Sequence, residues 1–261
     1  MPKINFTYLS KYSYDVCDRP KPASHYIPDW HKNMPNYSPT PTCPSGNKLS
    51  IVNGGSNATA KKCMPMLDSI SSGYIVPLWA DVLVEKTPNG PFINWTVDQH
   101  VFTVHGSSYQ GMPSPAGFAN IVFKYMTYFR MHTPPGYSVL VKPPSGHDNL
   151  PIQVVSAIVD TDKSIIDSNF PCWIRSDFEG VIKKGAPIAQ VIPFKREDWK
   201  SDFSYVSEEE YQIQLNRGFL NTIKNNYVDR YWSRKKYELP HTHPAAKNRK
   251  PKVETTKEHY V

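Results

Sequence analysis

The chain has few of the features that point directly to a chemistry. It contains only four cysteines in 261 residues, and no two of them form a Cys-x-x-Cys pair. This spacing disfavours a zinc site, provides no disulfide framework and fits reduced thiols in a cytoplasm. No segment approaches the roughly 18 consecutive apolar residues of a membrane span, and the N-terminus lacks the apolar core of a secretory signal. We therefore expect a protein that is neither secreted nor transmembrane.

The chain has nine histidines, but their spacing is not that of a metal-binding motif. His100 and His105 are five residues apart, so a regular strand would point them to opposite faces. No His-x-Asp or His-x-Glu pair combines with a distant histidine into the two-histidine, one-carboxylate pattern of a non-haem iron site. Residues 105–118 are rich in Gly, Ser and Pro but lack the GxxxxGK[ST] spacing of a phosphate loop. We expect no metal site and no cofactor.

Charge is sparse outside the C-terminus. The formal net charge is +7, and residues 234–261 carry eight basic and three acidic side chains, a net +5. The rest of the chain is close to neutral and offers no basic binding face. The plainer interpretation of the tail is a solvated, flexible end, and the sharper one is docking to nucleic acid or an acidic partner. The second interpretation assigns the contacts to Lys247, Arg249, Lys250 and Lys252.

Proline and aromatic residues are plentiful by contrast, with 25 Pro, 16 Tyr, 11 Phe and 6 Trp. Because proline breaks helices and is tolerated in loops and at strand edges, we expect no bundle of long helices before residue 200. Nine prolines in residues 1–65 predict an irregular N-terminal arm. A short helix is expected at Met66–Ser71.

Runs of β-branched and aromatic residues, separated by Pro, Gly, Asn and Ser, fill residues 66–200. This texture is typical of a β-sandwich or barrel and predicts a β-barrel domain. Pro77 lies inside the first run and is tolerated only near a sheet edge or a bulge. The expected strands are Tyr74–Glu85, Phe92–Val97, Val101–Val104, Asn120–Met131, Tyr137–Val141, Ile152–Asp160, Phe170–Arg175 and Ile188–Phe194.

The apolar period changes after residue 200. Ser207 and Glu210 form a capping box, and apolar residues then recur every four positions. This pattern indicates a long amphipathic helix of roughly 25–30 residues within 201–239, followed by the basic flexible tail at 240–261. The helical stripe must be buried against the β domain or against another subunit. It consists of Tyr211, Leu215, Phe219, Ile223, Tyr227 and Tyr231.

An ordered series of turns occupies residues 134–194. It comprises Pro134-Pro135-Gly136-Tyr137, Pro143-Pro144-Ser145-Gly146, Ile158–Asp162, Lys183-Lys184-Gly185 and Ile188–Ile192. This order resembles the dUTPase and dCTP deaminase superfamily, in which a PPG turn, an R-S-G turn, a V-I-D-x-D segment and a K-x-G-x-x-I-A-Q strand follow one another at similar spacing. The resemblance implies a mainly β protein with a β-clip, or jelly-roll-like barrel, of a kind that often forms trimers. The Lys-Lys-Gly turn is expected to close a hairpin whose Ile188, Val191 and Ile192 enter the core.

The resemblance also implies a nucleotide site. Asp160 falls at the position of the carboxylate that activates water, and Asp162 is its neighbour. Ser145, Gly146 and Gln190 fall at positions implied to bind nucleotide.

The sequence departs from the superfamily at the positions of the phosphate-binding and catalytic motifs. Pro144 stands where the superfamily has an arginine, which removes a bidentate clamp for phosphate. Lys163 replaces an aromatic residue that would stack on the sugar. The deaminase glutamate and the C-terminal dUTPase motif have no match. Arg130 follows a run of large apolar residues, so we expect it to be buried and paired in a structural role.

A second resemblance covers more of the chain. Segments 62–68, 72–78 and 129–137 look like a family encoded by tailed phages and some bacteria, with no activity attached. Together these patterns favour a non-enzymatic, oligomeric β module: a phage structural or accessory protein, located in the virion or the host cytoplasm, whose partners are its own copies or other virion proteins. The alternative is a nucleotide-binding or nucleotide-processing enzyme with Asp160 or Asp162 as base and Mg²⁺ as cofactor. A second alternative is a nucleic-acid-associated protein that uses the basic tail.

Overall fold

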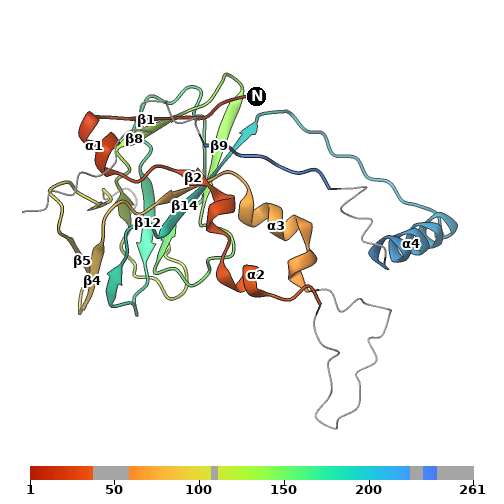
Figure 1. Ribbon diagram of the computed structural model, residues 1–261, viewed down its shortest axis with the longest axis horizontal. Coiled ribbons are helices and arrows are strands. Elements are labelled where there is room, and N and C mark those ends of the chain that lie inside the picture. The colour runs from red at the N-terminus through yellow and green to blue at the C-terminus, as the bar shows by residue number, and fades with distance from the viewer. Residues whose placement is uncertain (38–58, 107–110, 224–231, 240–261) are drawn as a thin grey trace, which may run out of the picture.

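Strands dominate the computed structural model, which describes residues 1–37, 59–106, 111–223 and 232–239 (Figure 1). All the strand pairs are antiparallel, and they form four sheets. Within the described ranges no sheet closes into a barrel. None of the described helices is both long and apolar enough to cross a membrane. The prediction of a mainly β protein is confirmed.

The five-stranded sheet positions the residues of the implied nucleotide site, which lie in β14 or just after β9 and β11. On its inner face Val76, Val139, Val141 and Val191 are buried in the main core. Pro77 pairs with Pro187 where the register shifts, so this proline sits at a bulge, as expected. In order across the sheet, the strands are β11 (Ala157–Val159), β9 (Tyr137–Lys142), β14 (Pro187–Lys195), β3 (Tyr74–Pro77) and β2 (Lys21–Pro22).

Three smaller sheets complete the body and pack their apolar faces into the same core. The four-stranded sheet has the order β10 (Ile152–Val154), β12 (Phe170–Ile174), β7 (Phe123–Tyr125) and β6 (Phe102–Val104). The three-stranded sheet has the order β13 (Gly180–Ile182), β4 (Val82–Thr87) and β5 (Gly90–Trp95). The two-stranded sheet joins β1 (Asn5–Tyr8) to β8 (Phe129–His132).

The described part of the N-terminal region is more regular than the expected irregular arm. β1 pairs with β8, and β2 pairs with β3, so the first residues are strands of the body. These strands are too short for an apolar period to be visible in the sequence. The other elements up to residue 71 are α1 (Lys11–Val16), η1 (Ala23–Tyr26), α2 (Asp29–Asn33), η2 (Ala60–Lys62) and α3 (Met64–Ser71). Helix α3 begins two residues earlier than the expected helix Met66–Ser71. Six of the nine prolines that suggested an arm lie in 1–37 and 59–65, and the other three lie outside the described residues.

Several expected strands are divided. The run 74–85 becomes β3 and β4, the run 120–131 becomes β7 and β8, and the run 152–160 becomes β10 and β11. Tyr128, between β7 and β8, has a φ of 56°, a left-handed conformation that continuous strand pairing does not allow. Each break lets the chain pass from one sheet to another, which an apolar run alone does not reveal.

The Lys-Lys-Gly turn does not close a hairpin. It leads from β13 to β14, which belong to different sheets. Gly185 adopts a φ of 87° and donates its N–H to the carbonyl of Leu78 at 2.7 Å, which fixes the crossing. Ile188 and Val191 are buried as expected, but Ile192 is only half-buried, because it lies on the opposite face of the sheet from Val191.

The C-terminal region contains α4 (Glu208–Ile223), which lies well away from the sheets in Figure 1. The Glu210 N–H donates to Ser207 Oγ, and the Ser207 N–H donates to Glu210 Oε2, both at 3.2 Å. Tyr211 and Leu215 are exposed. The side chains of Phe219 and Ile223, and all of Tyr227 and Tyr231, lie outside what the structure describes. The helix length of 25–30 residues stays a prediction.

Candidate functional site

Two of the implied nucleotide residues, Ser145 and Gln190, lie in a hydrogen-bonded cluster at the end of β9. Gln190 of β14 lies opposite Lys142 of β9, and the turn after β9 places Ser145 beside both. The Ser145 N–H donates to Gln190 Oε1 at 3.0 Å, and Lys142 Nζ donates to Ser145 Oγ at 2.6 Å and to Gln190 Oε1 at 3.2 Å. The pairing of β9 with β14 therefore joins residues that are 45 positions apart in the sequence.

Gln190 is fully buried, and both the oxygen and the nitrogen of its side-chain amide form hydrogen bonds. Its Nε2 donates to the carbonyls of Ser69 and Ser72, at 2.9 and 2.7 Å, at the C-terminal end of α3. The hydroxyls of Ser69 and Ser145 are 3.0 Å apart and share a hydrogen bond. The cluster therefore ties α3 to the five-stranded sheet, and burial lowers the pKa of Lys142.

The turn that would hold phosphate is covered by the N-terminal segment. Trp30 Nε1 donates to the Gly146 carbonyl at 2.7 Å, and His147 Nε2 lies 2.7 Å from the Tyr26 carbonyl. Gly146 has a φ of 77°, and a Cβ there would lie 3.1 Å from Pro28 Cγ and 3.2 Å from Trp30 Cζ2. The glycine therefore allows the N-terminal segment to pack directly on the turn.

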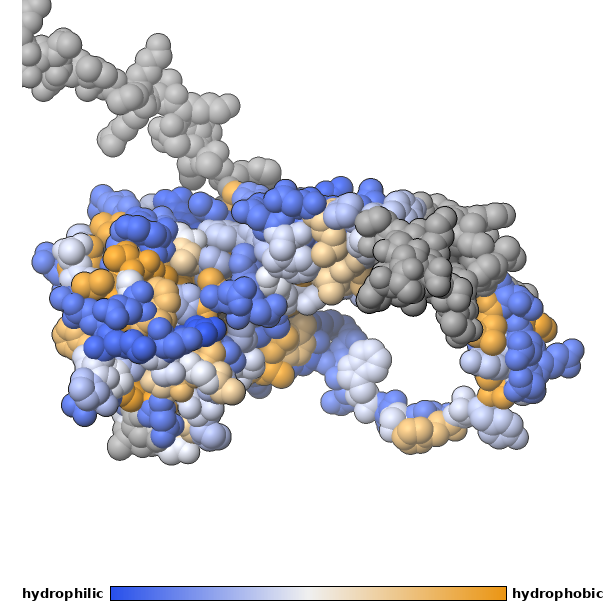
Figure 2. Space-filling model, turned by 90° about the horizontal axis from the view of Figure 1, so that it is seen from below, coloured by the Kyte–Doolittle hydropathy of each residue, from blue (hydrophilic) through white to orange (hydrophobic). Residues whose placement is uncertain are grey.

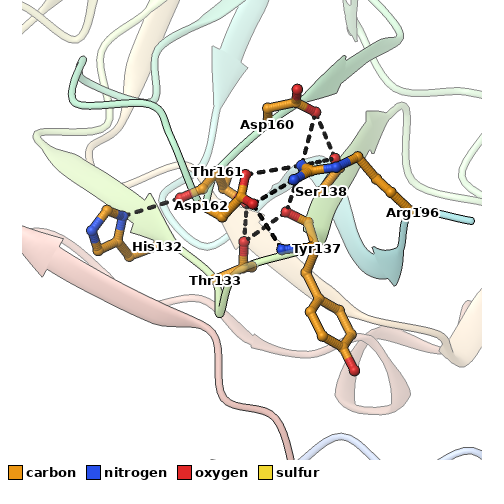
Figure 3. A network of polar contacts seen from close by, with 9 residues as sticks. His132, Thr133, Tyr137, Ser138, Asp160, Thr161, Asp162 and Arg196 are labelled. Carbon is orange, nitrogen blue, oxygen red and sulfur yellow. Dashed lines mark hydrogen bonds and ion pairs between the residues drawn. The ribbon is translucent and has the colours of Figure 1, made fainter.

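The two aspartates form a second cluster around Arg196 (Figure 3). Arg196 directly follows β14, and its guanidinium holds both carboxylate oxygens of Asp162, with 2.9 Å between Nη1 and Oδ1. The N–H of Gly136, in the Pro-Pro-Gly turn, donates to Asp162 Oδ2 at 2.8 Å. The turn takes the expected tight form, since Tyr137 N–H reaches the Pro134 carbonyl at 3.2 Å and Gly136 has a φ of 83°.

Asp160 occupies the more open side of this cluster. Its carboxylate accepts a 2.6 Å hydrogen bond from Ser138 Oγ and lies 3.1 Å from Arg196 Nη1. The Asp160 side chain is 50% exposed, whereas that of Asp162 is 5% exposed. The Ser138 hydrogen bond, helped by the Arg196 charge, lowers the pKa of Asp160. The Arg196 hydrogen bonds hold the pKa of Asp162 far below its ordinary range.

Threonines hold the backbone of this cluster in place. Thr133 and Thr161 share a hydrogen bond between their hydroxyls at 2.6 Å, and both side chains are buried. Thr133 Oγ1 also donates to the Tyr137 carbonyl at 3.1 Å, and His132 Nδ1 lies 3.1 Å from the Thr161 carbonyl. In Figure 3 the Tyr137 ring points away from the carboxylates. The carboxylates and Arg196 are therefore fixed from several elements.

The geometry brings the implied residues together in two groups instead of one. Ser138 and Lys142 anchor the two groups at opposite ends of β9, and four residues of strand span roughly 13 Å. A general base works best when its pKa lies near the working pH. Both aspartates have pKa values shifted away from that range, and both form ion pairs with Arg196.

Other candidates lie elsewhere in the described structure. Arg130 is not buried as expected: its side chain is 50% exposed, because it is on the outward face of β8, and it pairs with Asp167 at 3.1 Å. A cavity of about 140 Å³ lies beside the left-handed Tyr128. It is lined by Ser10, Tyr12, Ser13, Cys17, Trp79, Gln99 and Tyr128. The basic tail with Lys247, Arg249, Lys250 and Lys252 lies outside the described residues.

Metal-binding groups do not gather in the part of the chain that the structure describes. No three His, Cys, Asp or Glu side chains there are placed to hold an ion together. Comparison with protein-family models, with curated proteins and with solved structures finds no match to this chain. The site is therefore interpreted from its own geometry.

Sequence reasoning missed three residues that shape these clusters. Arg196 lies just past the last expected strand, and nothing near it in the sequence reveals its partner 34 residues away. Lys142 comes directly after the expected strand Tyr137–Val141, and Trp30 reaches Gly146 across 116 positions. The only available signal was weak: an Asp-x-Asp pair after one strand and an arginine after another.

Proposed function

We propose that the protein is an oligomeric β module with no catalytic role, and that its sheets are a variant of the β-clip, or jelly-roll-like, framework. One observation carries the proposal: the residues at the implied nucleotide positions are engaged by the protein's own chain. Ser145 and Gln190 bond to Lys142 and to α3, and Gly146 receives Trp30. Asp160 and Asp162 are held by Arg196.

Exposed apolar residues support assembly as the role of the module. Trp199, Phe203 and Tyr205 are 88%, 91% and 95% exposed. Soluble monomers seldom expose adjacent large aromatic residues without an interaction partner. Given the resemblance to the tailed-phage family, we propose a structural or accessory role in a virion or its assembly, in the virion or host cytoplasm.

Sedimentation velocity of the full chain tests the oligomer across a range of concentrations. We expect a concentration-dependent species larger than the 29.8 kDa monomer. A strict monomer at high protein concentration would contradict the proposal. Calorimetric titration with dUTP, dCTP and their non-hydrolysable analogues in Mg²⁺ should give neither heat of binding nor turnover.

The rival is a nucleotide-binding or nucleotide-processing protein. The observation that favours it is the half-exposed carboxylate of Asp160 beside the guanidinium of Arg196. This rival predicts saturable binding of a nucleotide in the same titration. It also predicts that Asp160→Asn abolishes turnover while leaving the fold intact.

A further inference from the structure

Large aromatic side chains are exposed on the segment between β14 and α4. In Figures 1 and 2 this segment stands off from the sheets, with open space between it and the body. Trp199, Phe203 and Tyr205 are almost fully exposed there, and Tyr211 and Leu215 of α4 are nearly half exposed. We call residues 197–217 the acidic handle.

The handle has the side-chain alternation of a β-strand. Trp199, Phe203 and Tyr205 are at odd positions, and Lys200 and Asp202 are at even positions. Successive side chains of an extended chain point to opposite sides, so an extended handle has one aromatic face and one polar face. Residues 196–207 are neither helix nor strand in this chain. Extended segments of this kind dock on the sheets of other chains.

The handle and the body of the chain carry net charges of opposite sign. The handle carries six acidic and two basic side chains, a net charge of −4, and residues 1–196 carry eighteen basic and thirteen acidic side chains, a net charge of +5. Opposite net charges on two surfaces steer their association and suppress wrong partners. The body of a second copy of this chain therefore carries a net charge opposite in sign to that of the handle.

The handle is anchored at both ends of its excursion. Arg196 fixes its root through Asp160 and Asp162. The chain returns to the body beyond α4, where Trp232 Nε1 donates to Asp68 Oδ2 at 3.0 Å and Lys235 Nζ pairs with the same oxygen at 2.6 Å. A projecting segment held at both ends loses less conformational freedom on binding than a free tail.

The outer face of the five-stranded sheet carries a row of apolar side chains that could pack against the aromatic face of the handle. Ile158 of β11 pairs with Leu140 of β9, which pairs with Ile192 of β14, so the three side chains lie side by side. Ile158 is 66% exposed, and Leu140 and Ile192 are half-buried. β11 is an edge strand of this sheet, so its outer backbone groups are open to pairing. We call these three residues the receiving row.

We propose that the acidic handle of one copy packs its aromatic face on the receiving row of a second copy, and that the exchange is reciprocal; this rests on the oligomeric function proposed above. The receiving row ends at Ile192, four residues before Arg196 at the handle root. The handle and the receiving row of one copy are therefore close in the chain, and a two-fold axis would repeat the same contact in both directions.

The size of the contact is adequate for a dimer. Three aromatic side chains bury roughly 150–250 Å² each, so two handles bury on the order of 900–1,500 Å² from aromatic residues alone. Stable interfaces bury about 1,200–2,000 Å² in total. The receiving rows and the start of α4 add to the aromatic contribution.

Sedimentation equilibrium on the full chain tests the exchange. The triple variant Trp199→Ser/Phe203→Ser/Tyr205→Ser should raise the dimer dissociation constant at least about 30-fold, as loss of buried aromatic anchors does. The matched control Lys200→Ser/Asp202→Ser alters the polar face without changing the net charge and should shift the constant by less than about twofold. Ile158→Glu, at an exposed edge position, should weaken the dimer as the triple variant does.

A mixing experiment distinguishes the two surfaces. The triple variant keeps an intact receiving row, and Ile158→Glu keeps an intact handle, so the mixture has one complete contact per pair. We expect the mixed dimer to be tighter than either variant alone. An oligomer that the triple variant leaves unchanged overturns the handle exchange but not the proposed function, whereas a monomeric wild type overturns both. A triple variant that dissociates, together with an Ile158→Glu variant that does not, overturns the receiving row.

Discussion

Arg196 and Asp162 form a two-point ion pair that joins the end of β14 to the loop after β11, 34 residues earlier in the chain. The pair is reinforced by the Gly136 N–H on Asp162 and by the Arg196 N–H on the Gly136 carbonyl at 2.8 Å. The same arginine marks the root of the acidic handle. This ion pair therefore both closes one end of the five-stranded sheet and sets where the handle begins.

Replacing Arg196 should destabilise the protein, because Asp162 would remain almost buried without its cationic partner. We expect Arg196→Met to lower the thermal midpoint clearly. Arg175→Met is the matched control, since Arg175 also contacts Asp177 at two points, at 2.9 and 2.7 Å, but Asp177 is 61% exposed. The control should have little effect. Equal losses in the two variants would show that the Arg196 pair is no more than a surface contact.

The Asp162 carboxyl should make stability depend on pH in the acid range. Its pKa in the folded state is held far below the value of about 3.9 expected when unfolded. Unfolding therefore takes up a proton, so the stabilisation is complete above about pH 4 and is lost as pH falls below it. Urea midpoints measured from pH 7 to pH 2 should fall steeply for the wild type and less steeply for Asp162→Asn. A variant with an unchanged slope would contradict the assignment.

Alanine substitutions at two glycines with similar backbone conformations distinguish the cost of backbone strain from the cost of a steric clash. Gly146 and Gly136 have φ values of 77° and 83°, so alanine is strained at both by about 1–2 kcal/mol. A Cβ at Gly136 meets nothing within 4 Å, whereas one at Gly146 presses on Pro28 and Trp30. We expect Gly146→Ala to lower the free energy of unfolding more than Gly136→Ala does. Equal losses would mean that the N-terminal segment does not pack tightly on this turn.

The sequence predicted local features well and long-range partnerships poorly. The strand runs, the Pro-Pro-Gly turn and the Ser207 capping box depend on neighbouring residues, and local chemistry decides them. The division of strands among four sheets depends on pairings between distant residues, which no period encodes. The same holds for the clusters: Asp160, Asp162, Ser145 and Gln190 could be named, but their partners Arg196 and Lys142 are fixed only by the register of β9 with β14. The N-terminal elements escaped because strands of two to four residues have no period to detect.

Gln190 should be the most sensitive polar residue in the sheet. It is fully buried, and Gln190→Leu would leave the Ser69 and Ser72 carbonyls, the Ser145 N–H and Lys142 without their present partner. Leaving buried polar groups unpaired costs about 1–3 kcal/mol each before relaxation, so we expect a loss of about 2–4 kcal/mol in the free energy of unfolding. Gln153→Leu, on β10, is the control for the substitution itself and should cost less than about 1 kcal/mol.

A double-mutant cycle decides whether Gln190 and Lys142 act as one unit. Burial lowers the pKa of Lys142, so its ammonium depends on acceptors such as Gln190 Oε1 at 3.2 Å and the Pro143 carbonyl at 2.8 Å. Lys142→Met removes that charge together with its need for acceptors. If the two side chains act together, Gln190→Leu should cost less in the Lys142→Met background than in the wild type, by about 0.5–2 kcal/mol. Strictly additive losses in urea unfolding would show that Gln190 stabilises the sheet independently of Lys142.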